Sequence, residues 1–381
     1  MTYEMATART WAEIDIDKVL HNYQRAMKGL ADGVVHYVVL KANAYGLGAV
    51  GLAKILYMEG IRHYAVACAA EAYELRHVLP LEAEILIMGV TMPPEIDAAL
   101  QNEIILTVCS TEEADAISER AGALGVTARI HCKVDTGLHR LGFPHEEAAG
   151  AIAQLLQLPN LRFEGLFSHL QRRSTAHDHL QGEYLVAVRD ALLAKGIEVP
   201  MLHLLDSIGM WRYPEKQFDA VRNAAFLIGH TPQDYPHPED LQFSLSFKTR
   251  IVRIHDAPPD ACLGYDSGHP LAKPARVATL CVGYADGYPR AMSHVGEVDI
   301  HGKRAKVLGV VCMDLMMVDV SHIPEAKVGG IATLLGASID IWAYAGFSGG
   351  YNNEYISLIS RRVPRVYIKG GRIIDIVGYM E

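Results

Sequence analysis

The sequence has few cysteines, no surplus of basic residues and no long apolar run. Its 381 residues include six scattered cysteines without a CxxC pair, so we do not expect the disulfide framework of a small secreted domain. The formal net charge is −9, which disfavours nucleic acid as a partner. No stretch approaches 18 uncharged apolar residues, and the first residues contain no apolar segment of the secretory type. We therefore expect a cytoplasmic protein with reduced thiols and no membrane contact of its own.

Short apolar runs alternate with helical segments over the first two-thirds of the chain. The helical segments are rich in Ala, Leu and Glu, as in 48–60, 111–124 and 181–195. Such alternation indicates βαβ units and a parallel sheet. Eight runs predict a closed (β/α)8 barrel, with an open doubly wound sheet as the alternative. The runs lie at 36–41, 64–67, 84–88, 104–108, 129–133, 163–169, 201–205 and 219–222.

The pattern changes near residue 241. Short strand-like runs broken by Gly, Pro and Asp follow, at 243–254, 275–284, 296–311 and 316–320, and they predict a mostly antiparallel β region. The proline-containing segment 231–240 is a predicted linker, and one helix is predicted over 354–362. We therefore expect two domains, a barrel over 1–240 and a β domain over 241–381, with 8–16 as a candidate segment for pairing with the second.

Charged and polar residues follow several predicted strands of the barrel, at the end where barrel enzymes carry their active sites. Lys41 ends the first strand and opens the segment KANAYGLG. A lysine in apolar surroundings has a lowered pKa and can bond covalently to a carbonyl cofactor. Lys133, Asp135 and Arg140 lie at the end of the fifth strand, in KVDTGLHRLGF. For each residue taken alone, a solvated surface role is the alternative.

Three further strand ends carry polar residues. They are His169, the pair Asp206 and Ser207, and Arg222. A lone histidine in an apolar run is more often a core residue, but polar groups at three successive strand ends favour a site. Arg222 stays protonated at any working pH, so whatever it faces must tolerate a fixed cation.

The β region contributes three more motifs, GYDSG (264–268), VGYADGYPR (282–290) and CMD (312–314). Tyrosines flanked by glycine usually pack in strand turns. Asp286, Asp314 and Asp319 have a spacing that fits neither an EF-hand nor an HExxH site, so we predict no metal. Cys312 has no histidine visible from sequence that would activate it as a nucleophile.

Together these motifs resemble the alanine racemase family and its serine racemase relatives, which are fold type III pyridoxal phosphate (PLP) enzymes. The resemblance extends from RTWAEIDIDKVLHNY (9–23) to SRRVPRVY (360–367), with the motifs in the family's order. It implies a PLP-binding barrel followed by a β domain, which agrees with the strand pattern. It also implies a homodimer with shared active sites that acts on a small-molecule amino acid.

The resemblance implies two catalytic bases and a set of cofactor-binding residues. Lys41 resembles the lysine that holds PLP covalently and serves as one base, and Tyr265 resembles the opposing base, which comes from the partner subunit. PLP would supply the electron sink between them. His169 would connect Tyr265 to Arg222, which resembles the arginine facing the pyridine nitrogen. The other positions that match cofactor-binding residues are Tyr45, Arg140, Ser207, Ala224 and Ala225.

Further positions resemble residues on the substrate side. Met313 matches a residue whose backbone N–H meets the substrate carboxylate, and Arg140 matches one that bonds the phenolate oxygen of PLP. Tyr284 matches a tyrosine of the entry corridor. Lys133 matches a position that is often carbamylated, where it would help to orient Arg140.

Three departures from the family pattern bear on function. Asp206 stands where the family usually has Asn, and RNAAF (222–226) lacks the usual glycine after the arginine, which brings the geometry of the phosphate loop into question. Asn353 stands where alanine racemases carry an active-site tyrosine. The smaller Asn makes room for a hydroxymethyl group and can hydrogen-bond it.

Asn353 therefore favours a racemase of both serine and alanine, similar to the catalytic domains of membrane-bound vancomycin-resistance serine racemases. The alternatives are a strict alanine racemase, a racemase of another amino acid, or a fold type III decarboxylase. The same resemblance leaves room for the cytosolic domain of a membrane-anchored protein, and it suggests that the product is a D-amino acid for cell-wall precursors.

Overall fold

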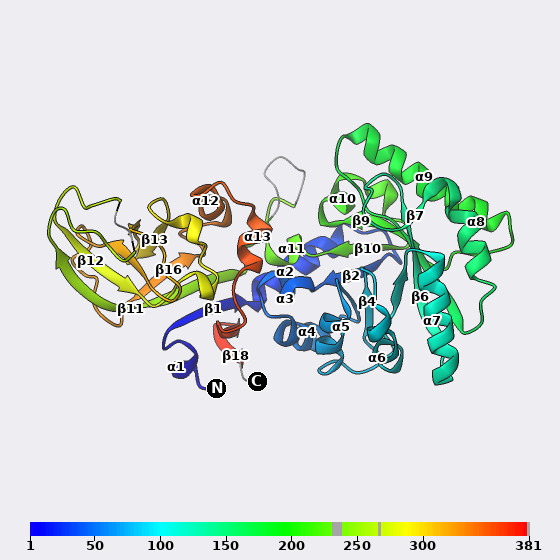
Figure 1. Cartoon of the computed structure of the whole chain (residues 1–381), viewed down its shortest axis with the longest axis horizontal. Coiled ribbons are helices and arrows are strands. Elements are labelled where there is room, and N and C mark those ends of the chain that lie inside the picture. Colours follow the sequence, from blue (N-terminus) through cyan, green and yellow to red (C-terminus); the bar gives the residue numbers. More distant parts are fainter. Residues whose placement is uncertain (231–237, 266–267, 379–381) are drawn as a thin grey trace.

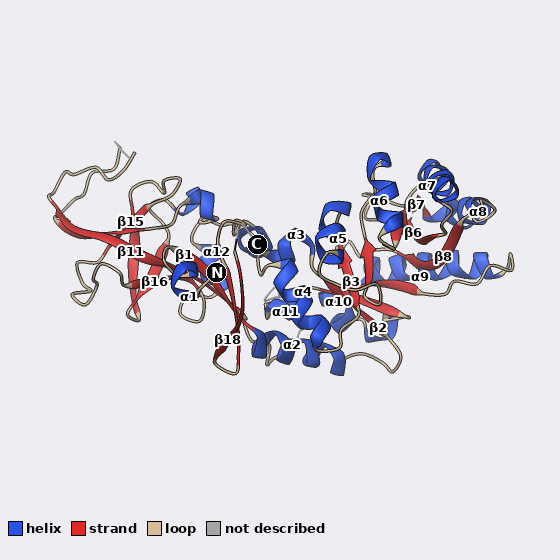
Figure 2. Cartoon of the chain, turned by 90° about the horizontal axis from the view of Figure 1, so that it is seen from below, coloured by secondary structure: helices blue, strands red, loops and turns tan. Residues whose placement is uncertain are grey.

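The computed structural model describes residues 1–230, 238–265 and 268–378, which form a barrel and a strand-rich region side by side (Figure 1). Helices surround the strands of the barrel, whereas the other region is built mainly of long strands (Figure 2). The helix α13 (Asn352–Ser357) lies between the two regions. Among the described residues, none of the helices combines the length and the apolar character needed to cross a bilayer.

The barrel strands run parallel in the order β4-β3-β2-β10-β9-β8-β6-β5. A parallel bridge between Leu86 and Ile105 joins the two ends of this path and closes the ring. Each strand begins and ends within two residues of its predicted position, so the (β/α)8 prediction is confirmed and the open-sheet alternative is wrong. The strands are β2 (Val35–Val39), β3 (His63–Val66), β4 (Glu84–Ile87), β5 (Leu106–Val108), β6 (Ala128–Asp135), β8 (Leu161–Phe167), β9 (Leu202–Asp206) and β10 (Ala220–Asn223), with the short β7 (Phe143–Pro144) beside β6.

Helices connect the barrel strands and bury apolar residues against them. In α7 (Thr111–Leu124), the Ser110 side chain accepts a hydrogen bond from Glu113 N and caps the helix, while Ala114, Ile117 and Ala121 are buried at helical spacing. The other helices of this region are α2 (Ile16–Lys28), α3 (Lys41–Tyr45), α4 (Ala49–Met58), α5 (Ala69–Arg76), α6 (Ile96–Gln101), α8 (His145–Leu155), α9 (Thr175–Leu193), α10 (Ser207–Arg212) and α11 (Ala225–Ile228), with 3-10 turns at Pro93–Glu95 and Pro214–Lys216.

The second sheet has the order β12-β15-β14-β13-β16-β11-β1-β17-β18. Its pairs are antiparallel except for β1 with β17, and this arrangement confirms the mostly antiparallel prediction. The strands are β1 (Thr10–Asp15), β11 (Leu245–Ala257), β12 (Ala275–Leu280), β13 (Glu297–Ile300), β14 (Lys303–Leu308), β15 (Met316–Asp319), β16 (Ile331–Leu335), β17 (Arg365–Lys369) and β18 (Arg372–Val377). Also here are α1 (Tyr3–Ala6), α12 (Ile341–Gly346), and 3-10 turns at Tyr284–Asp286 and Arg290–Met292.

The chain passes from the second sheet into the barrel region within one residue. β1 is buried between β11 and β17, and Asp15 at its end caps α2 by accepting a hydrogen bond from Lys18 N. The predicted linker 231–240 lies between α11 and β11, and its residues 231–237 lie outside the described residues. After it, Asp240 still contacts Arg25 of α2, and Gln242 N donates to Asn22 of the same helix. The N-terminal strand therefore belongs to the second sheet, although the barrel follows it directly in sequence.

The helix predicted over 354–362 differs from the observed one. α13 spans Asn352–Ser357, so it begins earlier and ends five residues sooner than expected. Pro364 disfavours helical backbone at the residue before it, and the preceding residues extend toward β17. This extension carries Arg362 and Arg365 to the polar contacts described below.

Candidate functional site

A cavity of about 520 Å³ opens at the carboxyl ends of the barrel strands. It brings together most of the residues predicted for the site from sequence. Trp342, Tyr351, Asn352 and Asn353 close it from the side of the second region. The predicted residues that line the cavity are Lys41, Tyr45, Lys133, Arg140, His169, Ser207, Arg222, Ala224, Ala225 and Asn353.

Lys41 begins a segment with unusual backbone geometry. Ala42, Asn43, Ala44 and Tyr45 all have φ between 52° and 55°, in the left-handed region. This conformation costs roughly 1–2 kcal/mol per non-glycine residue, so the surroundings must hold it in place. At Gly46 (φ 86°) an added Cβ would lie 2.1 Å from the carbonyl oxygen of Ile356, which explains the glycine at this close approach.

Two charged side chains hold this left-handed segment. The Glu71 carboxylate accepts hydrogen bonds from Ala42 N (2.6 Å) and from Ala67 N (2.8 Å). From β17, Arg365 Nε donates to the carbonyl oxygen of Gly46 at 3.0 Å. The strain is therefore balanced by contacts from both regions, and the result is that Lys41 and Tyr45 both line the cavity.

The environment of Lys41 favours its neutral amine. Burial lowers the pKa of Lys41, and the positive charge of Arg140 lowers it further, against the opposing effects of Glu71 and Asp206. The Lys41 Nζ lies 5.8 Å from the centroid of the Tyr45 ring. A neutral amine is both a nucleophile and a proton acceptor, so this lysine has the properties of a covalent anchor and of a base.

Backbone donors converge at a second point of the cavity. Ala224 N and Ala225 N each donate to Ser207 Oγ at 3.0 Å, and that hydroxyl lies 2.8 Å from Asn223 Oδ1. Ala224 has φ −128°, outside the left-handed region that requires glycine, and both donors are in place without the family glycine. The two N–H groups and the hydroxyl therefore gather at one point of the cavity wall, and groups of this kind can bind a phosphate.

Arg222 is fully buried among acceptors at the base of the cavity. Its guanidinium donates to His203 Nδ1 (2.6 Å) and to two backbone carbonyls, and it lies 3.4 Å from His169 Nδ1. Burial lowers the pKa of Arg222 to about 10, and the negative charge of Asp206 opposes this shift. At neutral pH this position therefore carries a fixed cation.

A chain of neutral histidines supports Arg222 from inside the barrel. Burial lowers the pKa of His203 far below its usual value, and the Arg222 charge adds to the effect. Since Arg222 donates to His203 Nδ1, the proton of the neutral ring is on Nε2, which lies 3.0 Å from His131 Nδ1. The sequence analysis did not single out His131 or His203, because each lies within an apolar strand.

Asp206, the first departure from the family pattern, has identifiable partners. Its Oδ2 lies 3.8 Å from Arg172 NH1, and its Oδ1 accepts a hydrogen bond from Gly209 N at 2.9 Å. Burial acts to raise the pKa of Asp206, but the positive charge of Arg172 and the hydrogen bond from Gly209 N lower it. The carboxylate is therefore ionised beside a neutral His169, whose own pKa burial lowers to about 3.

Lys133 is a buried amine surrounded by cations. Burial lowers its pKa to about 8, and Arg222, Arg140 and Lys41 act in the same direction. Its Nζ lies 5.0 Å from the centroid of the Phe167 ring. Buried cations normally need a negative partner. A carbamate formed on Lys133 would carry a negative charge beside Arg222, Arg140 and Lys41.

The remaining predicted residues lie apart from the cavity in the single chain. Tyr265 is 84% exposed, and Met313 and Tyr284 are 53% and 42% exposed. Residues 266 and 267 of the GYDSG motif lie outside the described residues. The Tyr284 and Met313 loops are joined, because Tyr284 N donates to Cys312 O and Ala285 N donates to Met313 O, each at 3.0 Å.

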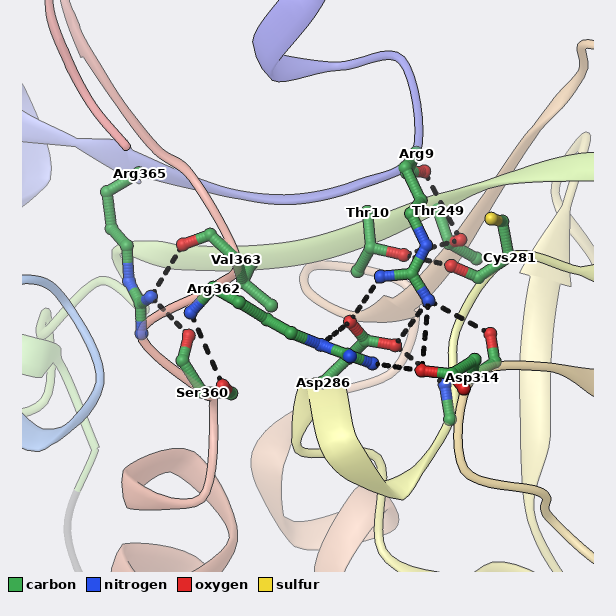
Figure 3. Close-up of polar contacts among 11 residues, drawn as sticks. Arg9, Thr10, Thr249, Cys281, Asp286, Asp314, Ser360, Arg362, Val363 and Arg365 are labelled. Atoms are coloured by element: carbon green, nitrogen blue, oxygen red, sulfur yellow. Dashed lines mark hydrogen bonds and ion pairs between the residues drawn. The ribbon is translucent and has the colours of Figure 1, made fainter. Parts of the chain in front are cut away.

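A cluster of two arginines and two aspartates fixes these loops (Figure 3). Asp286, which is fully buried, accepts hydrogen bonds from Arg9 NH1 at 2.7 Å and from Arg362 Nε at 2.8 Å. Arg362 NH2 also donates to Asp314 Oδ1 at 2.8 Å. Two of the three aspartates considered for a metal, Asp286 and Asp314, are thus paired with arginines, and they connect the start of β1, the motif VGYADGYPR and the motif CMD. Asp319 lies apart from this cluster and accepts a hydrogen bond from Ser321 N.

Several residues of the cavity were not predicted from sequence. Arg172, His230, Trp342 and Tyr351 line it from helices or loops that carry no recognisable motif, and Glu71 supports it from behind through Ala42 N. The signal for Glu71 was weak, since an acidic residue in the first turn of a helix usually serves the helix itself.

Comparison with known proteins agrees with this geometry. Residues 14–232 match the family model for the N-terminal domain of alanine racemase, and residues 244–367 match that for the C-terminal domain. The alanine racemase of Desulfovibrio desulfuricans is 37% identical over 366 residues, covering 94% of this chain and 98% of that protein.

Solved structures give the same result. The alanine racemase of Clostridium difficile 630 has a TM-score of 0.94 at 32% identity, with 98% of this chain and 99% of that chain covered. The alanine racemase of Bartonella henselae with covalently bound pyridoxal phosphate has the same fold, with a TM-score of 0.84 at 24% identity and coverage of 94% and 99%. The chain belongs to the alanine racemase family.

Proposed function

We propose that this protein interconverts L- and D-alanine with PLP as its cofactor and that it also accepts serine. One observation carries the racemase assignment: a lysine with a lowered pKa, a phosphate-type donor set and a fixed arginine line a single cavity. The relatives reported above are alanine racemases, so alanine is the main substrate of this proposal. Serine is the added one, and it rests on Asn353.

The residues present fit PLP. Ser207 Oγ with the Ala224 and Ala225 N–H groups would hold the phosphate, and Arg222 would face the ring nitrogen. The cavity of about 520 Å³ falls within the usual size range for cofactor sites. When bound, PLP supplies the electron sink that makes the α-proton of an amino acid acidic enough to remove.

The protein's task is then to move that proton between two faces. In this proposal Lys41 Nζ accepts the α-proton on one face and returns it in the reverse direction. Its lowered pKa keeps part of the amine population neutral for this role. The cations of the cavity meet the two anionic groups that enter, which are the cofactor phosphate and the substrate carboxylate.

The second base must act from the opposite face. Within the described part of one chain, Tyr265 of the GYDSG motif does not line the cavity. Tyr265 is 84% exposed at a loop of the second region. We propose that two copies of the chain associate so that Tyr265 of each subunit enters the cavity of the other. His169, which lines the cavity and lies 3.4 Å from Arg222, would receive it there.

The serine proposal rests on Asn353 at the wall of the cavity. An Asn side chain leaves more room than the family tyrosine, and it offers both a donor and an acceptor to a hydroxyl. One hydrogen bond shifts specificity by about 0.5–1.5 kcal/mol, or up to roughly tenfold, so dual activity is expected rather than exclusive use of serine.

The test is racemisation of L-serine and L-alanine by the PLP-loaded protein, with chiral detection. We expect turnover of both, and Asn353→Tyr should reduce kcat/KM for serine more than for alanine. Equal losses for both substrates would remove the basis for the serine proposal. If neither substrate turns over, release of CO2 from basic amino acids would favour the decarboxylase alternative.

A further inference from the structure

His230 is a buried histidine at the cavity wall that the mechanism above does not use. It follows the left-handed Gly229 at the end of α11, and it is 7% exposed. Burial lowers the pKa of His230 to about 4, so the ring is neutral at physiological pH and carries one N–H. Neither ring nitrogen has a hydrogen-bonded partner among the described residues. Burying an imidazole without a hydrogen-bond partner destabilises the fold, so we expect a partner among its neighbours.

The neighbour that matters is Asn353. It lines the same cavity, and its side chain is close enough to the His230 ring to favour protonation of the ring. Asn353 Oδ1 is also buried and lacks a hydrogen bond among the described residues. The amide nitrogen of Asn353 differs from this oxygen. It is not among the buried atoms that lack a partner, and it donates no described hydrogen bond.

We propose that His230 is a positioning residue that holds Asn353 through an N–H···Oδ1 hydrogen bond and so presents the Asn353 amide N–H to the cavity. The opposite orientation, with Asn353 Nδ2 toward the ring, leaves Oδ1 facing the cavity and turns an acceptor toward the substrate. The first orientation is the one that gives the buried Oδ1 atom a partner.

An amide N–H directed into the cavity selects an oxygen acceptor. The oxygens available there are the side-chain hydroxyl of serine, the substrate carboxylate, and the phosphate and phenolate oxygens of PLP. The resemblance gives the carboxylate to the Met313 N–H and the phenolate to Arg140, which leaves the hydroxyl and the phosphate. Ser207 and the two backbone N–H groups already serve as phosphate donors, so we assign the Asn353 N–H to the substrate hydroxyl. This assignment rests on the proposed racemase function, and it names His230 as the residue behind the preference for a hydroxylated side chain.

The test compares His230→Leu with His230→Gln in the PLP-loaded protein. Leu has a comparable volume and no donor, whereas Gln keeps an N–H that can reach Asn353. The measured quantities are KM for alanine, the constant for inhibition of alanine racemisation by serine, and PLP affinity from absorbance titration of the cofactor-free protein. Serine inhibition is measurable whether or not serine turns over, which separates this test from that of the serine proposal.

For His230→Leu we expect serine to bind about three- to tenfold more weakly, with little change in the alanine KM or in PLP affinity. His230→Gln should restore most of the serine affinity. Asn353→Ala and the double variant should match His230→Leu, because the two residues act as one unit. Unchanged serine affinity in His230→Leu, or additive losses in the double variant, would overturn the proposal. A loss of PLP affinity alone would overturn the assignment to the substrate hydroxyl.

Discussion

The two regions of this molecule carry their functional residues in opposite ways. In the barrel, Lys41, Ser207 and Arg222 line one cavity. The hydrogen bonds of Ser207 and Arg222, and the burial that lowers the pKa of Lys41, all arise within a single chain. In the second region, Tyr265 and Met313 are exposed, although the loop that carries Met313 is firmly held. The contacts of the buried residues can be described from one chain, whereas the role of the exposed residues depends on what covers them.

The difference also appears in the electrostatics. In the barrel, burial shifts the pKa values of ionisable side chains, and it lowers those of Lys133 and His169. The second region keeps charges in arginine–aspartate pairs (Figure 3). Its Tyr265 and Met313 are exposed. Under the proposed function, the barrel would carry one base and the cofactor contacts, and the second region would supply Tyr265 to a partner subunit. The following predictions test that division.

The largest effect should follow from Lys41→Ala. Removing the lysine eliminates both the covalent anchor and one base, and a general base alone contributes about 10²–10⁴-fold. We expect racemisation to fall by at least that factor, and the absorbance of covalently held PLP to be lost. Lys54, a lysine on α4 that does not line the cavity, provides the control, and Lys54→Ala should leave both readouts unchanged.

Mixed dimers test whether the exposed half serves another subunit. Lys41→Ala and Tyr265→Ala are each expected to be inactive alone. When the two are co-expressed, about half of the dimers are mixed, and each mixed dimer contains one intact site, so about a quarter of wild-type activity should return. Pairing Lys41→Ala with the double variant Lys41→Ala/Tyr265→Ala leaves no intact site and is the control. No recovery in the first mixture would contradict shared sites.

The architecture was predictable from sequence because it depends on local periodicity. Apolar runs separated by amphipathic helices indicated each barrel strand, and polar residues at the strand ends indicated the site, as for Lys41 and Arg222. Strand boundaries differed by up to two residues, since the ends of strands depend on tertiary contacts. The helix at Asn352–Ser357 was placed too late because its end depends on Pro364 and on the contacts of Arg362.

The supporting residues were not predictable for a physical reason. Glu71 and His203 have roles that arise from partners far away in sequence, at Ala42 and Arg222. A histidine in an apolar strand and a glutamate in a first helical turn both have ordinary structural explanations. His230 was missed for the same reason, because its significance comes from its missing partners and from its place beside Asn353.

Asp286→Asn tests how firmly the presenting loops are held. The change removes a buried charge that compensates Arg9 and Arg362, which are themselves about one-third exposed, so solvent offsets part of the loss. We expect the free energy of unfolding to fall by about 2–3 kcal/mol, below the full cost of breaking a buried pair. Asp314→Asn is the matched control, because that carboxylate is 53% exposed and should contribute less than about 1 kcal/mol. Equal effects would contradict a special role for the buried carboxylate.

The smallest effect concerns Lys133 in the cofactor-free protein. Its pKa is about 8 when folded and about 10.5 in its ordinary state, so between these values the unfolded chain binds more protons and stability rises with pH. From pH 7 to 9 we expect a gain of about 1 kcal/mol in CO2-free buffer, and Lys133→Met should remove this slope. Bicarbonate sharpens the test: carbamylation joins the neutral amine to CO2 and releases a proton, which replaces the titrating cation by an anion. Bicarbonate should therefore steepen the wild-type profile toward about 1.4 kcal/mol per pH unit, because the carbamate binds no proton while the unfolded lysine still binds one. Bicarbonate should leave Lys133→Met unchanged, and a wild-type profile insensitive to bicarbonate would argue against the carbamate.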